Sequence, residues 1–196
     1  MKITDIELRM LRVPLKTPFK TALRTVDTVE DIVVLVRTDT GHTGHGEAPA
    51  TAVITGDTHG SIAEAIERFI KPRLIGQEIA NLNRICGLIQ GALERNTSAK
   101  AAVEIAVYDL WAQLYDAPLY KMLGGGDPVI TTDITISVDH IDKMVADSIS
   151  AVERGFDSLK IKVGKDIGLD IERVKAIHAA VEGRALLRLD ANQGWT

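Results

Sequence analysis

Two lysines spaced two positions apart, and a carboxylate further along, are the residues whose types and spacing point to chemistry. Lys160 and Lys162 lie within the apolar segment 158–163, and Asp190 ends a later apolar segment. Side chains of a β-strand alternate between its faces, so both lysines share one face and the apolar residues take the other. The apolar face must pack on helices, which directs the lysines to the interior of a barrel. An edge strand of an antiparallel sheet that shows its lysines to water is the alternative.

This spacing favours one lysine as a proton acceptor. Two ammonium groups about 6.6 Å apart repel each other by roughly 2.5 kcal/mol at an effective dielectric constant of about 20. Burial and a nearby divalent cation act in the same direction. A neutral amine is a general base, so the strand predicts chemistry that begins with removal of a proton.

Asp190 adds a metal ligand to this prediction. It stands in the sequence Leu-Asp-Ala-Asn-Gln-Gly-Trp at 189–195, at the end of the next predicted strand. Parallel α/β folds place their active sites at the carboxyl ends of the strands. A hard oxygen ligand beside two lysines indicates Mg²⁺, whereas a lone aspartate at a strand end also serves as a turn or helix cap. Two motifs at the same depth in successive strands favour the metal.

The elements that must position these residues form a repeating pattern in the second part of the chain. Three short apolar segments alternate with two helical patterns, at residues 133–138, 140–154, 157–163, 168–182 and 185–190. Gly155 and Gly183 follow the two helical patterns, where helix C-terminal caps occur. The order β-α-β-α-β predicts parallel strands of a doubly wound sheet or a (β/α)8 barrel. The G-x-G-x-x-G signature of dinucleotide-binding sheets is absent after the first of these strands.

Strands open the first part of the chain. Alternating apolar residues predict a strand from Ile3 to Leu15, followed by a polar interruption at 16–28. Segments 31–38 and 41–48 read as a hairpin that turns at residues 39–41.

Helical patterns follow these strands. The first begins at a capping box, Ser61 to Glu64, and is expected to stop at Pro72. Two more lie around 82–89 and 102–113, and three glycines at 124–126 close the segment. Strands followed by helices predict an α+β domain over residues 1–123 and a second domain over 124–196.

The composition of the chain limits the classes of partner that it is expected to bind. The chain has 196 residues, and its 23 basic and 27 acidic residues give a net charge of -4. This balance offers no electrostatic basis for binding nucleic acid, so small molecules or other proteins are the expected partners. One cysteine, Cys86, forms no internal disulfide, and the N-terminus has no signal or membrane segment. We therefore expect a cytoplasmic protein without membrane contact. We also expect it to assemble as a homo-oligomer.

Four features together resemble the muconate-lactonizing subgroup of the enolase superfamily. They are the K-I-K strand at 160–162, the D-A-N-Q strand end at 190–193, the G-H-T-G-H-G-E-A hairpin at 41–48, and an α+β domain before a barrel. The resemblance spans the whole chain, and within the subgroup it is greatest to dipeptide epimerases of the L-Ala-D/L-Glu type. It implies an α+β N-terminal capping domain followed by the first three βα units of a (β/α)8 TIM-type barrel.

The resemblance also implies a reaction and its residues. The enzyme is a Mg²⁺-dependent isomerase that removes the α-proton next to a carboxylate and passes through an enediolate. Lys162 is the base on one face of the substrate, and Lys160 supports it and binds substrate. Asp190 is the first metal ligand, and Thr135 lines the pocket. The second base and the other metal ligands belong to later barrel strands, so we expect the chain to be the N-terminal part of a longer enzyme.

In such an enzyme, two loops of the capping domain set the substrate. They are 16–28, with Phe19 and Arg24, and 50–57, with Ile54. Arg24 offers a fork of donors that suits the side-chain carboxylate of a C-terminal glutamate, or it is a solvated loop arginine. Muconate cycloisomerase, o-succinylbenzoate synthase and N-acylamino acid racemase use the same parts. A non-catalytic fragment or binding module is the alternative from another class.

Two histidines and two polar helix residues have simpler roles. His42 and His45 are spaced like metal ligands, but they fall in a predicted hairpin, and the neighbouring glycines fit tight turns. Asp109 and Gln113 are expected to form a polar seam or an exposed helix face.

Overall fold

The computed structural model describes residues 1–21, 24–127, 129–192 and 194–195. The chain forms two compact units. We call Met1–Val13 with Val29–Asp127 the cap unit, and Pro14–Thr28 with Pro128–Thr196 the barrel unit. The segment 14–28 therefore groups with the second part of the chain, although the division predicted from sequence assigns it to the first.

The cap unit is built on an antiparallel sheet of three strands in the order β1-β2-β3. The strands are β1 (Ile3–Lys20), β2 (Thr25–Thr38) and β3 (Thr43–Pro49). Gly41 takes a φ of +82° in the turn between β2 and β3, as predicted for this hairpin. The prediction that the first strand ends at Leu15 is wrong. β1 is an edge strand, which tolerates prolines and polar residues, so it continues to Lys20.

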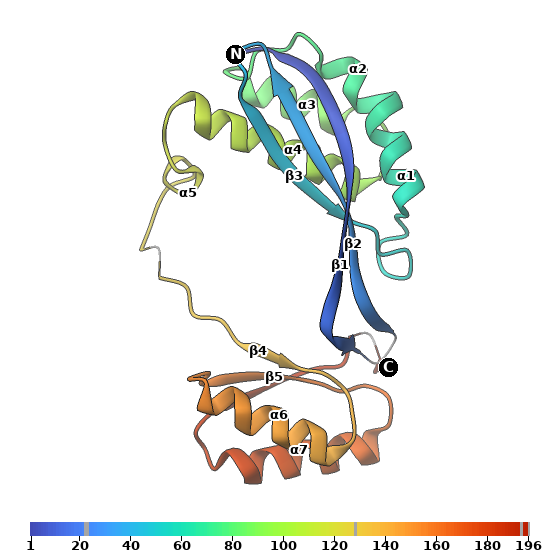
Figure 1. Ribbon diagram of the computed structural model, residues 1–196, viewed down its shortest axis with the longest axis vertical. Coiled ribbons are helices and arrows are strands. Elements are labelled where there is room, and N and C mark those ends of the chain that lie inside the picture. Colours follow the sequence, from blue (N-terminus) through green and yellow to red (C-terminus); the bar gives the residue numbers. More distant parts are fainter. Residues whose placement is uncertain (22–23, 128, 193, 196) are drawn as a thin grey trace. The chain divides into compact units, whose positions relative to one another are not determined.

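Helices cover one face of this sheet (Figure 1). They are α1 (His59–Glu64), the π-helical turn η1 (Ala65–Ile70), α2 (Lys71–Leu74), α3 (Leu82–Gln90) and α4 (Thr97–Leu114). The short helix α5 (Leu119–Met122) follows α4 and buries no residue. The N-cap of the first helix lies three residues before the one predicted from the capping box at Ser61. This N-cap is Thr58, whose Oγ1 accepts from the Ser61 amide at 3.1 Å, and the Ser61 hydroxyl accepts from the Thr58 amide at 2.9 Å.

Pro72 does not end the first helical path. It lies in the first turn of α2, where the fixed φ of proline suits a helix, and the helical path continues from η1 to Leu74. This continuation adds an apolar residue to the core, because Leu74 is fully buried.

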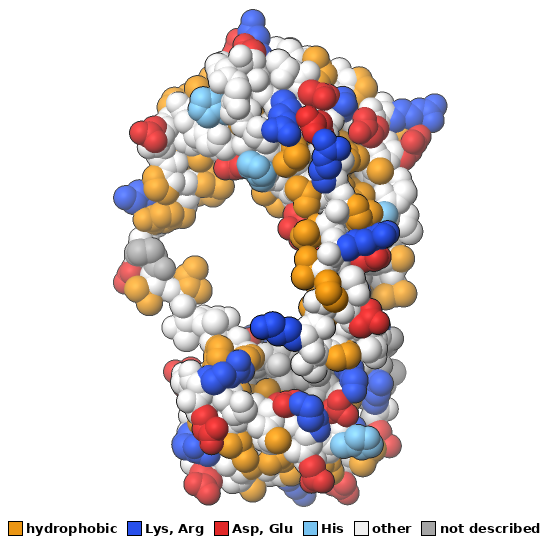
Figure 2. Space-filling model, viewed as in Figure 1, with side chains coloured by type: hydrophobic (Ala, Val, Ile, Leu, Met, Phe, Trp, Pro, Cys, Tyr) orange, Lys and Arg blue, Asp and Glu red, His pale blue; other side chains and the backbone are white. Residues whose placement is uncertain are grey.

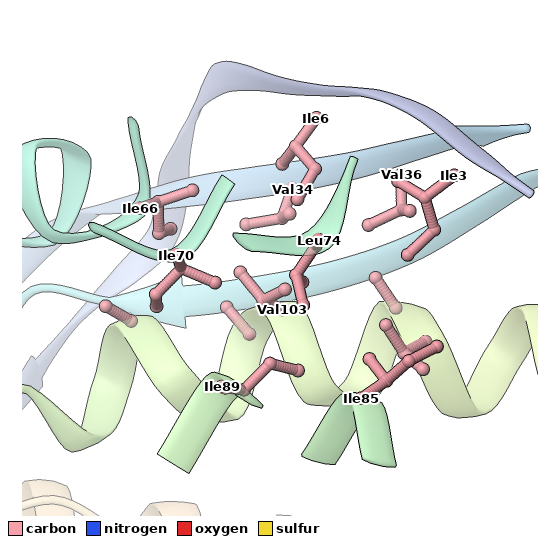
Figure 3. Close-up of a cluster of buried hydrophobic side chains, with 14 of the residues drawn as sticks. Ile3, Ile6, Val34, Val36, Ile66, Ile70, Leu74, Ile85, Ile89 and Val103 are labelled. Atoms are coloured by element: carbon pink, nitrogen blue, oxygen red, sulfur yellow. The ribbon is translucent and has the colours of Figure 1, made fainter. Parts of the chain in front are cut away.

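The core of the cap unit lies between the sheet and these helices. Figure 3 shows Val34 and Val36 of β2 facing Leu74 and Val103. Helix α4 approaches β3 closely through two strand glycines. A Cβ atom on Gly44 would lie 2.1 Å from the carbonyl oxygen of Ala106, and one on Gly46 would lie 1.9 Å from that of Ala102. The prediction that these glycines serve tight turns is wrong, because they lie within β3 and admit the helix backbone.

The barrel unit carries a parallel sheet in the order β4-β5-β6. Its elements are β4 (Ile134–Ile136), α6 (Ile141–Glu153), β5 (Ser158–Lys162), α7 (Ile167–Val181) and β6 (Leu186–Asp190). Helices α6 and α7 lie side by side on one face of the sheet (Figure 1). Gly155 and Gly183 have φ of +95° and +72°, which confirms them as helix-ending residues.

The β-α-β-α-β order confirms the predicted fold class, an α+β domain followed by the first strands and helices of a barrel. Within the described residues, no helix is both long enough and apolar enough to cross a membrane. On the face drawn in Figure 2, basic and acidic side chains are interspersed with apolar ones.

Candidate active site

Strand β5 presents the two lysines as the period of two predicts. Leu159 and Ile161 are fully buried against α6 and α7, while Lys160 and Lys162 occupy the opposite face. The side chain of Lys162 is 6% exposed and that of Lys160 is 33% exposed. Lys162 is therefore the better shielded of the two amines.

Asp190 joins the two lysines. In the parallel register, Lys162 lies opposite Asp190. The Oδ2 atom of Asp190 lies 2.6 Å from Nζ of Lys162 and 3.0 Å from Nζ of Lys160. These hydrogen bonds, the one from Lys162 foremost, hold the pKa of Asp190 well below its usual range. The ammonium groups thus share one carboxylate oxygen, which offsets the repulsion that the sequence spacing alone predicts.

Asn192 is a site residue that sequence reasoning missed. Its Oδ1 atom accepts from Nζ of Lys162 at 2.8 Å, and its amide donates to Oδ1 of Asp190 at 2.9 Å. Asn192 has a φ of +46°, a conformation that asparagine tolerates better than most residues. The available signal was the D-A-N-Q sequence, where an amide side chain follows the strand end. Gln193 of that sequence lies outside the described residues.

The loops after β5 and β6 touch through their backbones. Gly164 has a φ of +111°, and a Cβ there would lie 2.6 Å from the carbonyl oxygen of Ala191. Gly194 is equally close on the other side, since its Cβ would lie 2.5 Å from the carbonyl oxygen of Gly164. This backbone contact holds the turn that carries Asn192 against the end of the lysine strand.

Three of the predicted substrate-binding residues belong to the same unit as the lysines. The ring centroid of Phe19 lies 5.8 Å from Nζ of Lys162, a cation–π distance. Thr135 lies opposite Lys160 in the register of β4 and β5, so both point to the same face. Arg24 is half-buried just before β2, and its amide donates to Oγ1 of Thr21 at 3.3 Å.

Ile54 belongs to the cap unit instead. Its side chain is 54% exposed. Ile54 lies in a turn in which its own amide and that of Thr55 both donate to the Thr51 carbonyl oxygen at 2.9 Å. Its predicted role in substrate binding stays a prediction.

The hairpin histidines are structural. The His45 amide and ring both contact Oδ2 of Asp109, at 2.9 and 3.3 Å. Nε2 of Gln113 donates to the Thr43 carbonyl oxygen at 3.0 Å, and Nδ1 of His42 lies 3.0 Å from Oγ1 of Thr40. Asp109 and Gln113 thus form the predicted polar seam between α4 and β3.

Asp190 fits a magnesium ligand in chemistry and in place. It is a carboxylate at the carboxyl end of a parallel strand, and Mg²⁺ is commonly bound by one or two carboxylates with waters and substrate oxygens. Among the described residues, no three His, Cys, Asp or Glu side chains come together as a metal cage. The described part of the chain therefore offers one metal ligand at this site.

Comparisons with known proteins agree with this geometry. The family model "Mandelate racemase / muconate lactonizing enzyme, N-terminal domain" matches residues 4–124, and the model "Enolase C-terminal domain-like" matches residues 143–196. An L-Ala-D/L-Glu epimerase of Clostridium acetobutylicum is 50% identical over 195 residues, covering 100% of this chain and 54% of that protein.

Two solved structures are similar in backbone. A substrate-liganded L-Ala-D/L-Glu epimerase from Bacillus subtilis has a TM-score of 0.96 at 51% identity, and covers 100% of this chain with 55% of its own. A dipeptide epimerase from Enterococcus faecalis, complexed with Mg and the dipeptide L-Leu-L-Tyr, has a TM-score of 0.95 at 40% identity and the same coverage. The chain spans about half the length of the relatives it matches. By these matches and by its lysine strand and strand-end aspartate, the chain belongs to the mandelate racemase / muconate lactonizing enzyme family of the enolase superfamily.

Proposed function

We propose that this chain is the N-terminal part of a Mg²⁺-dependent dipeptide epimerase of the L-Ala-D/L-Glu type. The reaction removes the proton from the carbon next to a carboxylate and returns a proton to the opposite face. One observation carries the proposal: Lys160, Lys162 and Asp190 converge at the carboxyl ends of two adjacent parallel strands. Relatives that match this chain along its whole length bear the name of that activity.

Lys162 is the base in this proposal. Its Nζ atom is shielded from water and fixed by Asp190 Oδ2 and Asn192 Oδ1. In its neutral form, Lys162 would accept the substrate's α-proton. When bound, Mg²⁺ supplies positive charge beside Asp190 for the substrate carboxylate.

The remaining residues orient the substrate. Lys160 keeps a positive charge next to the carbon that becomes electron-rich, and Thr135 lies beside it on the same face. Phe19 forms an apolar wall against Lys162. Arg24 binds the side-chain carboxylate of the dipeptide, and Ile54 contributes from the capping domain. In this proposal, the predicted capping domain, residues 1–123, determines which substrate binds. The predicted barrel domain, residues 124–196, carries the catalytic residues.

The proposal requires further residues that this chain does not contain. A base on the opposite substrate face and more carboxylate ligands complete the reaction, and we assign them to later strands of the barrel. We also propose that the enzyme acts in the cytoplasm as a homo-oligomer on small molecules, without nucleic acid or membrane partners.

Proton exchange tests the function. The complete enzyme is incubated in D₂O with Mg²⁺ and either L-Ala-L-Glu or L-Ala-D-Glu, and proton NMR follows the α-hydrogen of the glutamate. We expect both epimers to exchange and interconvert, with activity lost on chelation and restored by added Mg²⁺. Turnover of muconolactone or an N-acylamino acid, with no exchange from any dipeptide, would move the assignment to another member of the subgroup.

The variant Asp190→Asn provides the matched control for the metal. It keeps the size of the side chain but removes the negative charge, so we expect weaker Mg²⁺ binding by titration calorimetry as well as slower exchange. Unchanged Mg²⁺ affinity in this variant would remove Asp190 from the ligand set.

A further inference from the structure

We propose that the ion pair between Lys20 and Asp139 is a positioning device, which holds the end of β1 on the barrel unit so that Phe19 stays against Lys162. Neither member of the pair touches the lysine strand's amines. The inference rests on the proposed function and adds residues that set the geometry of the base.

Lys20 is fastened to the barrel unit at three points. Its Nζ lies 2.6 Å from Oδ2 of Asp139. Its amide donates to Oγ of Ser137 at 3.3 Å, and its carbonyl oxygen accepts from the Val138 amide at 3.2 Å. All three partners follow directly after β4, so a single residue joins the end of β1 to the end of the first parallel strand.

This attachment fixes Phe19 because the two residues are consecutive. In an extended strand, adjacent side chains point to opposite sides, which lets Lys20 reach Asp139 while Phe19 lies over Lys162. A shift of Lys20 along the strand therefore moves the Phe19 ring away from the amine.

Asp139 is itself linked by hydrogen bonds to the part of the barrel unit that carries Lys162. Its carbonyl oxygen accepts from Nε of Arg173 at 3.1 Å. Arg173 pairs with Asp170 at 2.9 Å, and the two side chains are only 12% and 3% exposed. Oδ2 of Asp170 then accepts from the Gly164 amide at 2.7 Å, two residues after Lys162. These contacts connect Asp139, the partner of Lys20, to the end of β5 that carries Lys162.

The carboxylate of Asp139 remains charged at neutral pH. The hydrogen bond from Lys20 lowers its pKa, and the His140 amide, which donates to Oδ1 at 2.9 Å, lowers it further. The negative charge that attracts Lys20 is thus present at neutral pH.

A mutant cycle tests the positioning role. The variants Lys20→Met, Asp139→Asn, Phe19→Ala and the double variant Phe19→Ala/Lys20→Met are made in the complete enzyme, with Lys16→Met as control. Lys16 is an exposed lysine of the same segment. Misplacement by about 1 Å can slow a reaction by up to about 100-fold, so we expect Lys20→Met and Asp139→Asn to lower kcat for L-Ala-L-Glu about tenfold.

Two readouts separate positioning from simple structural support. Because Phe19 is itself a predicted substrate-binding residue, Lys20→Met should change kcat and KM in the same direction as Phe19→Ala, and it should add little to Phe19→Ala if it acts through that ring. The reversed pair Lys20→Glu/Asp139→Lys should regain most of the kcat. Additive losses in the cycle, or no recovery in the reversed pair, would overturn the proposal.

Hydrogen exchange provides a test that does not depend on activity. Amides of the segment 14–21 should exchange faster in Lys20→Met and Asp139→Asn, but not in Lys16→Met. Unchanged exchange in the first two variants would show that the ion pair does not hold the segment. A wild-type enzyme that is inactive on dipeptides would instead refute only the proposed function, because the exchange measurement still reports on the attachment.

Discussion

Buried charged side chains of the cap unit and the barrel unit have different kinds of hydrogen-bond partner. In the cap unit, Nζ of Lys100 donates to the Gln90 carbonyl oxygen at 2.9 Å, and Oδ2 of Asp57 accepts from the Ser98 amide at 3.4 Å. In the barrel unit, Lys162 instead meets another charge, on Asp190. Lys100 and Asp57 satisfy backbone groups and support the fold, whereas the opposite charges of Lys162 and Asp190, on adjacent strands of one sheet, mark a place where charge can be redistributed.

The two units also differ in how their sheets meet helices. In the cap unit, Gly44 and Gly46 bring the backbone of α4 onto β3. In the barrel unit, the helices pack on larger side chains such as Leu159 and Ile161, and close backbone contact occurs at Gly164 and Gly194 beside the site. Glycine therefore allows helix packing in one unit and close contact between the loops after β5 and β6 in the other.

The largest effect is expected from removing the buried lysine of each unit. Lys162→Ala should lower α-proton exchange from the epimer presented to that base by about 10² to 10⁴-fold, measured by deuterium incorporation. Lys100→Ala, the matched control, should lower the melting temperature yet leave the exchange rate within about twofold. Equal exchange from both epimers in Lys162→Ala would refute the assignment of the base.

The next largest effect concerns the strand glycines. Gly46→Ala should destabilise the cap unit by about 3 kcal/mol or more, because the new Cβ would lie 1.9 Å from the Ala102 carbonyl oxygen. Gly87→Ala, in helix α3, has no atom within 4 Å of the added Cβ and should stabilise the protein by about 0.5–1 kcal/mol. Thermal unfolding followed by circular dichroism measures both. Similar melting temperatures would mean that α4 moves away from β3 at little cost.

A smaller effect separates substrate recognition from general attraction. Arg24→Ala should reduce kcat/KM for L-Ala-L-Glu about 10- to 100-fold and hardly change it for a dipeptide that ends in an apolar residue. Lys16→Ala is the appropriate control for electrostatic steering, because Lys20 is engaged with Asp139. Equal losses for both substrates would leave the loop as a steering surface and favour another member of the subgroup.

The smallest effect lies in the cap unit and depends on pH. A hydrogen bond with Asp31 raises the pKa of Glu47, and burial adds to the rise. The protonated form therefore stabilises the fold below about pH 4.5, and this contribution disappears as the pH rises through the raised pKa. Glu47→Gln, which imitates the protonated form, should be slightly more stable than wild type at pH 7, by less than about 0.5 kcal/mol.

At pH 4 this difference should vanish. Melting temperatures at the two pH values provide the measurement, and Glu94→Gln, at an exposed glutamate of the same unit, is the control. A Glu47→Gln variant that is less stable at pH 7 would show that the charged form contributes favourably.

The sequence predicted features that depend on local periodicity. The alternation in 158–163 was sufficient to place Lys160 and Lys162 on one face, and the strand-end position of Asp190 followed from the same pattern. The loop at 16–28 was predicted too long, because a polar edge strand and a loop have similar composition. Its contact with Asp139 joins residues 119 positions apart, and no local pattern reports such a pair.

The strand glycines and Asn192 were missed for a related reason. A glycine in a strand fits a turn, a bulge or close packing equally well until its neighbour is known, and the neighbours of Gly44 and Gly46 lie on a helix far along the chain. Asn192 turns toward Lys162 because of its left-handed backbone conformation, which the residue type permits without requiring.

The attachment of Lys20 to Asp139 has a consequence for synthesis on the ribosome. At about 5 to 20 residues per second, the 119 positions between them take roughly 6 to 24 s to translate. During this interval the end of β1 lacks its partner. It contains Pro14, Lys16, Pro18 and Lys20, and prolines and lysines discourage a strand from pairing with other chains. Lys20, which later pairs with Asp139, is thus also one of the residues that make this edge strand unfavourable for pairing with other chains before the barrel strands are made.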